Sequence, residues 1–156
     1  MIRVGQHAPL FSLPDADMQP VALSAFRGKK HVVLFFYPRD GTPGCTLEAS
    51  DFSDHENQFL EHDCAIVGIS RDDCLTHADF RDRNGLSIQL LSDLEGEVCR
   101  LYGVLKDKQF EGTRRECLLR STFVIDKKGV VRHAAYGVSP RHHVADIFEV
   151  VRALRH

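Results

Sequence analysis

A strand, a loop and a helix start follow one another directly near the middle of this chain, and this order constrains its fold most. The run His31–Tyr37 is apolar without alternation, which is typical of a strand covered on both faces. The loop Pro38–Cys45 comes next, and the helix-compatible run Thr46–Phe52 follows it. Thr42 suits the N-cap of that helix and Pro43 suits its first position. The order predicts an α/β sheet with this loop at the carboxyl end of a strand, where such sheets place their sites.

Other segments extend the α/β pattern along the chain. The run Cys64–Ser70 predicts a second buried strand, parallel to the first and joined to it by a right-handed crossover. Short alternating runs before His31 predict a small hairpin. Further strands are expected at Leu90–Leu91, Leu118–Ile125 and Val130–Tyr136. Helices are expected from Pro43 to about Glu61, over Leu75–Asn84, over Leu94–Tyr102 and from Ser139–Pro140 onward. We expect one domain over residues 1–156, with helices on both faces of a mixed sheet.

Composition excludes several classes of function. The chain has 156 residues, and its 20 Lys and Arg against 22 Asp and Glu leave a net charge of -2. That balance argues against nucleic acid or an acidic membrane surface as a partner. No apolar stretch reaches the length of a signal peptide core or a membrane span, so we expect a cytoplasmic protein.

Cys45 is the candidate nucleophile. It falls in the first turn of the predicted helix, where unpaired N–H groups and a partial positive charge favour the reactive thiolate. The five cysteines are widely spaced and form no C-x-x-C motif, so neither a zinc ribbon nor a dithiol motif is expected. We interpret Cys64, Cys99 and Cys117 as packing residues. The nine histidines show no ligand spacing, and no metal is expected.

A thiolate that attacks a peroxide needs cations and hydrogen-bond donors around it. Thr42 offers a hydroxyl, the amides of Gly44 and Cys45 offer N–H groups, and Pro38 could shield the pocket from water. Arg120 is the best candidate for a cation, because it interrupts a strand-like segment where an unpaired charge is expensive to bury.

Arg120 has a second interpretation as a structural ion pair. Glu48 or Asp51 could be its partner, and such a carboxylate could at the same time orient the guanidinium toward a thiolate. The two roles are therefore compatible.

The pattern Pro38-x-x-x-Thr42-x-x-Cys45 resembles the active-site signature of the peroxiredoxins. The run Tyr37–Thr46 is similar to one branch in particular, the bacterioferritin-comigratory (BCP) or PrxQ proteins. Supporting blocks lie in the same order over essentially the whole chain: Gly5–Phe11, Ala25–Lys29, Gly68–Asp72, Leu91–Asp93 and Arg120–Asp126.

The resemblance implies a thioredoxin-like fold with an N-terminal β-hairpin and a helical insertion around Leu94–Tyr102. It implies that Cys45 is the peroxidatic cysteine and is oxidised to a sulfenic acid. Thr42, Gly44 and Arg120 would bind the thiolate and the peroxide oxygens, and Pro38 would cover the thiol. No metal or organic cofactor is implied.

The chain departs from the branch at the resolving cysteine. Ser50 stands five residues after Cys45, where many members have that cysteine, and the alternative stretch Ala78–Asn84 has none. An external thiol such as thioredoxin, glutaredoxin or glutathione could instead reduce the sulfenic acid. Alternatively, Cys74 could do so from the same sheet edge, provided that the helix unwinds and the two Cα atoms come within ~7 Å.

We therefore predict a thiol peroxidase that reduces hydrogen peroxide and organic hydroperoxides to water and alcohols. Its role would be antioxidant defence and redox homeostasis, and a monomer is expected. A thioredoxin-like disulfide oxidoreductase is disfavoured, because Thr46–Glu48 supplies no second cysteine. A redox sensor or holdase without turnover needs the same reactive cysteine and stays open.

Overall fold

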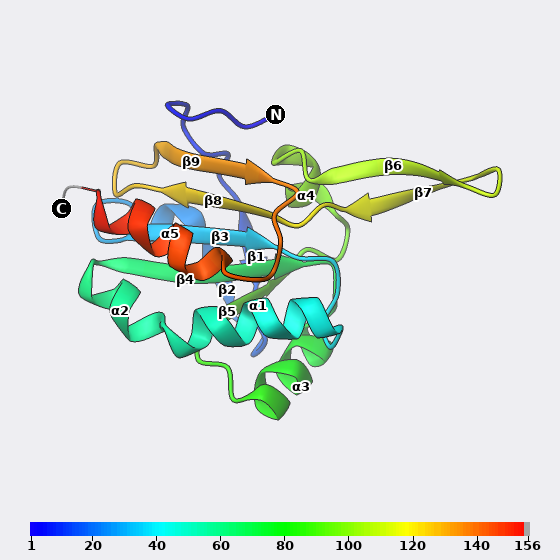
Figure 1. Cartoon of the computed structure of the whole chain (residues 1–156), viewed down its shortest axis with the longest axis horizontal. Helices are drawn as coiled ribbons and strands as arrows, with labels where there is room; N and C mark the ends of the chain where they lie inside the picture. The colour runs from blue at the N-terminus through cyan, green and yellow to red at the C-terminus, as the bar shows by residue number, and fades with distance from the viewer. Residues whose placement is uncertain (155–156) are drawn as a thin grey trace.

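A mixed five-stranded sheet lies at the centre of the molecule, in the order β5-β4-β3-β8-β9 (Figure 1). The computed structural model describes residues 1–154. Strands β3, β4 and β5 are parallel, β8 runs antiparallel to β3, and β9 runs antiparallel to β8 and so in the same direction as β3. Their bounds are His31–Phe36 for β3, Cys64–Ser70 for β4, Gln89–Ser92 for β5, Ser121–Ile125 for β8 and Val131–Tyr136 for β9.

Strand β3 occupies the middle of the sheet, and every one of its residues is buried. It pairs in parallel with β4 from His31 opposite Cys64 to Phe36 opposite Ile69, which confirms the predicted parallel pair. On its other side it pairs antiparallel with β8. Burial on both faces explains why its sequence shows no alternation.

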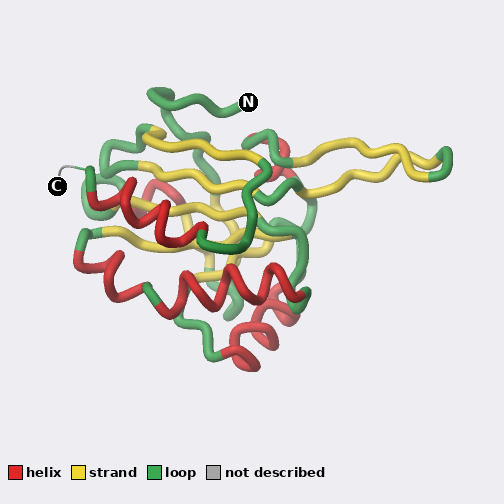
Figure 2. The backbone as a smooth tube through the Cα atoms, viewed as in Figure 1, coloured by secondary structure: helices red, strands yellow, loops and turns green. Residues whose placement is uncertain are grey.

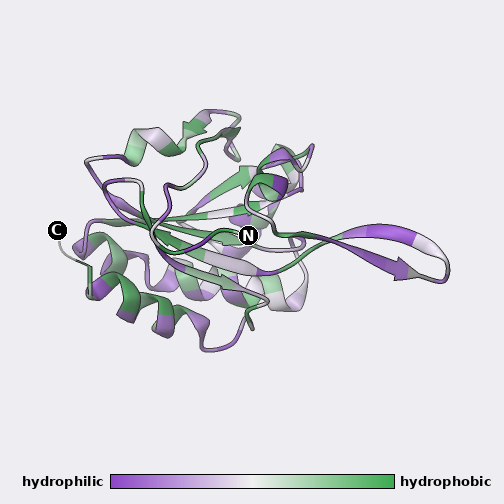
Figure 3. Ribbon diagram, turned by 90° about the horizontal axis from the view of Figure 1, so that it is seen from above, coloured by the Kyte–Doolittle hydropathy of each residue, from purple (hydrophilic) through white to green (hydrophobic). Residues whose placement is uncertain are grey.

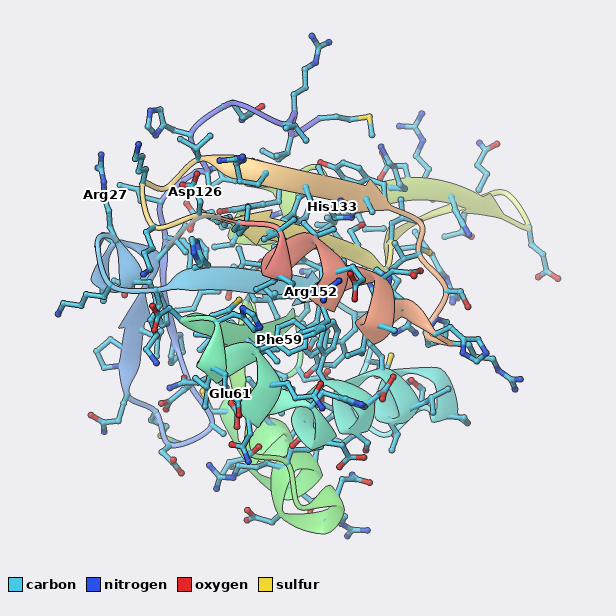
Figure 4. The ribbon with its side chains drawn as sticks, turned by 60° about the vertical axis from the view of Figure 1, so that its left-hand side comes forward. Arg27, Phe59, Glu61, Asp126, His133 and Arg152 are labelled. Carbon is cyan, nitrogen blue, oxygen red and sulfur yellow. The ribbon has the colours of Figure 1, made fainter. Side chains whose placement is uncertain are left out.

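Four helices cover one face of the sheet: α1 (Pro43–Asp54), α2 (Glu56–Glu61), α3 (Cys74–Asn84) and α5 (His143–Arg152) (Figure 2). Their apolar side chains form one core with the inward side chains of β3 and β4. In Figure 4, Phe59 lies among the packed side chains of this layer, while Arg27 points away from the molecule. None of the helices within residues 1–154 is long and apolar enough to cross a membrane.

The single helix predicted from Pro43 to about Glu61 is wrong, because the helix breaks at His55 between α1 and α2. The N–H of His55 is shared between the carbonyl oxygens of Asp51 and Phe52, and its Nδ1 lies 2.8 Å from the Asp51 oxygen. These local hydrogen bonds close the last turn of α1 and let the chain change direction.

The opposite face is covered by the N-terminal segment, a short helix η1 (Leu23–Phe26) and α4 (Glu97–Leu101) (Figure 3). The predicted hairpin is confirmed as β1 (Ser12–Pro14) and β2 (Pro20–Ala22). Helix α4 begins later than predicted. The carboxylate of Asp93 accepts hydrogen bonds from the N–H groups of Val98 and Cys99, and Leu94 stays outside the helix and exposed.

A polar hairpin that the sequence did not predict extends away from the body of the molecule (Figure 1). It consists of β6 (Leu105–Phe110) and β7 (Thr113–Leu118). The predicted strand Leu118–Ile125 is therefore wrong at its start, because Leu118 ends β7 and β8 begins only at Ser121. Cys117 belongs to β7, and Arg120 lies in the short connection between two strands rather than inside one. Both hairpin strands are mostly exposed, so they carry no apolar alternation to reveal them.

Gly68 of β4 provides a test of core packing. A Cβ at this position would lie 2.7 Å from Phe35 Cζ and 3.1 Å from Leu90 Cδ2. We expect Gly68→Ala to lower the free energy of unfolding by about 1–3 kcal/mol, measured by urea denaturation. Phe35→Leu removes the ring that would clash, so the double variant should lose less than the sum of the single losses. Additive losses would show that the two side chains do not compete for this space.

Candidate active site

Cys45 lies in the first turn of α1, at the carboxyl end of β3, as predicted. Thr42 is the N-cap residue and Pro43 begins the helix, because the fixed φ of proline suits that position. The Cys45 side chain is almost entirely buried, at 1% exposure. It therefore sits beside the free N–H groups of a helix start, in a place from which water is largely excluded.

Arg120 joins Cys45 to Glu48. Its Nη2 donates a hydrogen bond to Cys45 Sγ at 3.3 Å, and its Nη1 donates one to Glu48 Oε1 at 2.8 Å. The structure thus contains both contacts of Arg120 at once, with Glu48 rather than Asp51 as the carboxylate, and the role of Arg120 toward a reacting thiolate stays a prediction. Burial alone would lower the pKa of Arg120, but Glu48 and Cys45 outweigh it and hold that pKa above its usual value.

Glu48 lies one helical turn after Cys45 and is fully buried. Burial raises the pKa of its carboxyl to about 7, although the charge of Arg120 acts in the opposite direction. Its second oxygen, Oε2, has no hydrogen-bond partner within the described part of the chain. A single cation therefore faces a carboxylate that is costly to ionise and a thiol that must ionise to react.

Gly44 makes the close approach of Arg120 possible. A Cβ on Gly44 would lie 3.3 Å from Arg120 Nη2 and 3.4 Å from Pro140 Cγ. Any larger residue would press on the guanidinium that binds Cys45. Pro140 precedes α5, and no sequence signal had placed it at this site.

Two of the predicted site residues show no direct contact with the thiol. The Thr42 hydroxyl donates to the carbonyl oxygen of Arg39 at 3.0 Å, which leaves its own oxygen available as an acceptor. Pro38 is exposed at the end of β3. Contact of Thr42 with the peroxide and covering of the thiol by Pro38 stay predictions.

The other cysteines occupy different environments, and all five cysteines are free. Cys64 and Cys99 are buried, and burial raises the pKa of Cys64 to about 12 and that of Cys99 still further, so both stay thiols, as expected of packing residues. Cys74 is half-buried and begins α3, which follows β4 at the same sheet edge as Cys45. Pairing of Cys74 with Cys45 stays a prediction.

Sequence reasoning missed a polar pair beside this loop. The Asp40 carboxylate, inside the Pro38–Cys45 segment, lies 2.6 Å from the ring of His77 on α3. Asp40 belongs to the signature-like segment, but His77 is a lone histidine in a helix, and only the fold brings the two together.

Comparisons with known proteins agree with this geometry. The AhpC/TSA family matches residues 4–134. Peroxiredoxin Bcp of Bacillus subtilis is 38% identical over 151 residues, which cover 97% of this chain and 96% of the relative. Peroxidoxin BcpB of Mycobacterium tuberculosis superposes with a TM-score of 0.88 at 34% identity, over 100% of both chains.

A third similar protein is the bacterioferritin comigratory protein of Xanthomonas campestris, whose structures concern its alkyl peroxide reduction activity. It superposes with a TM-score of 0.88 at 30% identity and covers 92% of this chain and 90% of its own. The chain belongs to the AhpC/TSA family, in its Bcp and peroxiredoxin Q branch, and is a thiol-dependent peroxidase with a thioredoxin-like fold.

Proposed function

We propose that Cys45 is the peroxidatic cysteine and that it reduces hydrogen peroxide and small organic hydroperoxides. The observation that carries this assignment is the hydrogen bond from Arg120 to the Cys45 sulfur at a helix start. The thiolate attacks the terminal peroxide oxygen, a new S–O bond forms and the O–O bond breaks. The leaving hydroxide or alkoxide takes up a proton and departs as water or alcohol, and Cys45 becomes a sulfenic acid.

Arg120 stabilises the negative charge as it moves from sulfur to the leaving oxygen. Its guanidinium is held in place by Glu48, so little reorganisation is needed when the peroxide binds. The amides near Gly44 and the hydroxyl of Thr42 complete the peroxide site in this proposal, and Pro38 limits the access of water.

The sulfenic acid is reduced by an external thiol. Ser50 offers no sulfur on α1, Ala78–Asn84 contains no cysteine, and Cys74 is held at a helix start where Asp73 caps the N–H of Thr76. One thiol forms a mixed disulfide with Cys45 and releases water. A second thiol then restores the Cys45 thiol and leaves as the oxidised disulfide.

Thioredoxin, glutaredoxin with glutathione, or another cellular thiol would be the electron donor. The five cysteines are odd in number and irregularly spaced, which is typical of a reducing compartment, and we place the protein in the cytoplasm. There it would act as a monomer in antioxidant defence and redox homeostasis.

The peroxidase assignment predicts the effects of two substitutions. Cys45→Ser should abolish peroxide consumption. Arg120→Lys should lower the rate constant of Cys45 oxidation by about 10²–10³, because an ammonium cannot bridge Glu48 and the sulfur as a guanidinium does. Stopped-flow measurements with hydrogen peroxide test both, with Arg115→Lys on the exposed hairpin as the matched control.

Turnover with an added thiol separates an enzyme from a sensor. If Cys45→Ser consumed peroxide as fast as the natural protein, Cys45 would not be the nucleophile. If the natural protein formed the sulfenic acid but no thiol returned it to the reduced state, the protein would be a sensor or holdase.

The one-cysteine cycle predicts the mass of the protein after one equivalent of peroxide. A gain of about one oxygen is expected, because no internal thiol condenses with the sulfenic acid. Cys74→Ser should leave that mass change and the turnover unaltered. A loss of about two hydrogens that disappears in Cys74→Ser would instead establish a Cys45–Cys74 disulfide.

The buried carboxyl of Glu48 predicts a pH-dependent stability. Its pKa in the folded state, about 7, is above its ordinary value of 4.5. The folded state therefore binds the proton more tightly than the unfolded state, and stability falls as the pH rises from about 4.5 to above 7. The difference between these two pKa values corresponds to about 3 kcal/mol of unfolding free energy.

A comparison with Glu48→Gln isolates this contribution. Urea unfolding at pH 5, 6, 7 and 8 should show the natural protein losing stability relative to Glu48→Gln as the pH increases. A constant difference across this range would mean that Glu48 does not titrate within it.

A further inference from the structure

His77 is a fully buried histidine that the chemistry of Cys45 does not use directly. Its Nδ1 lies 2.6 Å from Asp40 Oδ2, and its Nε2 lies 3.0 Å from the carbonyl oxygen of Leu91. Both oxygens are hydrogen-bond acceptors, so each ring nitrogen lies beside one acceptor and the orientation of the ring is fixed. The side chains of His77 and Asp40 are 0% and 2% exposed, so the contact between them is buried.

The other oxygen of the Asp40 carboxylate also accepts a hydrogen bond. The hydroxyl of Tyr37, at the end of β3, donates to Asp40 Oδ1 at 2.6 Å. Burial and the nearby Asp40 keep the pKa of Tyr37 well above its usual value, so this hydroxyl keeps its proton and stays a donor. Asp40 therefore links the end of β3 to the first turns of α3.

The backbone of Asp40 has a second anchor. Its N–H donates to Asp72 Oδ2 at 2.9 Å, and the hydroxyl of Ser70 donates to the same oxygen at 2.6 Å. Asp72 lies in the connection from β4 to α3. The loop is thus held through both a side chain and a peptide group.

We propose that His77 is a positioning residue of the peroxidase site, which fixes the Pro38–Cys45 loop through its buried contact with Asp40. The inference rests on the proposed function of Cys45. Only Gly41 separates Asp40 from Thr42, whose carbonyl oxygen accepts hydrogen bonds from both the N–H and the hydroxyl of Thr46. Any displacement of Asp40 is therefore passed to the first turn of α1 and to the Cys45 sulfur.

The contact between His77 and Asp40 acts on geometry more than on stability. A buried polar pair contributes little more to stability than a well-packed apolar pair, but removal of one partner leaves the other without its hydrogen bond. The pair fixes the direction of the His77 ring, because each ring nitrogen lies within hydrogen-bond distance of one oxygen. Misplacement of a reacting group by about 1 Å can cost about 100-fold in rate.

A metal ion could in principle hold the same groups. The ligand atoms of Asp40, Asp72 and His77 lie within 4.8 Å of one another. Hydrogen bonds already account for both nitrogens of His77 and for the Asp72 oxygen nearest to Asp40. These hydrogen bonds explain the cluster without a metal, and the response of the rate to EDTA and Zn²⁺ tests the metal alternative.

The test compares His77→Gln, Asp40→Asn and the double variant. Each single substitution should lower the rate constant of Cys45 oxidation by hydrogen peroxide by about tenfold or more. The double variant should fall by clearly less than the product of the two, because each single change leaves a buried partner unmatched. His7→Gln, a change at an exposed histidine, is the matched control and should be neutral.

A second readout separates positioning from general loosening. Alkylation of Cys45 by iodoacetamide needs the thiolate but not the alignment of a peroxide. The variants should therefore lose more of the peroxide rate than of the alkylation rate, and amide exchange should increase at residues 39–45.

Tyr37→Phe keeps the test decisive if the His77 and Asp40 variants do not fold. It removes only the hydroxyl that donates to Asp40 and should lower the peroxide rate by about 2- to 10-fold. Unchanged peroxide rates, multiplicative effects in the double variant, or a rate that depends on EDTA or added Zn²⁺ would overturn the proposal. A natural protein whose Cys45 is not oxidised at all would instead overturn the proposed function.

Discussion

The guanidinium of Arg120 is the interaction on which the rest of the site depends. It connects two residues of α1, Cys45 and Glu48, to a loop 75 residues further along the chain. Coulomb attraction is less screened in this buried place than at the surface, although burial of the Glu48 carboxylate opposes it. The sheet makes the bridge possible, because β8 runs antiparallel to β3 and its preceding loop therefore lies where β3 ends.

Two sets of buried polar contacts hold the start of α1. On one side, Arg120 pairs with Glu48 and the sulfur, and Gly44 leaves the space for it. At the loop before the helix, the ring of His77 lies 2.6 Å from the carboxylate of Asp40. Each set joins the helix start to a different part of the fold, so the position of Cys45 is determined from two sides. A nucleophile at a frayed helix end would not be held in a fixed position in this way.

Much of this arrangement could be predicted from local pattern. An unbroken apolar run predicted β3, and Thr42 followed by Pro43 predicted the start of α1. Arg120 was identified because a charge among apolar residues requires a partner, although it lies in a loop rather than in a strand.

The rest depended on contacts between distant segments or on features without a periodic signal. The β6–β7 hairpin is solvated on both faces and so has no apolar period. The break at His55 follows from a shared amide hydrogen bond, and His77 gains its significance only when α3 packs beside the loop that carries Asp40.

Backbone hydrogen bonds fix the β6–β7 hairpin where it leaves the body of the molecule, and this has a consequence for how the sequence can change in evolution. The N–H of Leu119 donates to the carbonyl oxygen of Val104, and the N–H of Val138 donates to that of Arg120. These two bonds fix the chain where the hairpin leaves the body, so motion or growth at its tip is not passed to Arg120. Insertions and deletions there should be tolerated. The hairpin is thus a segment in which relatives can change length while the chemistry of Cys45 is preserved.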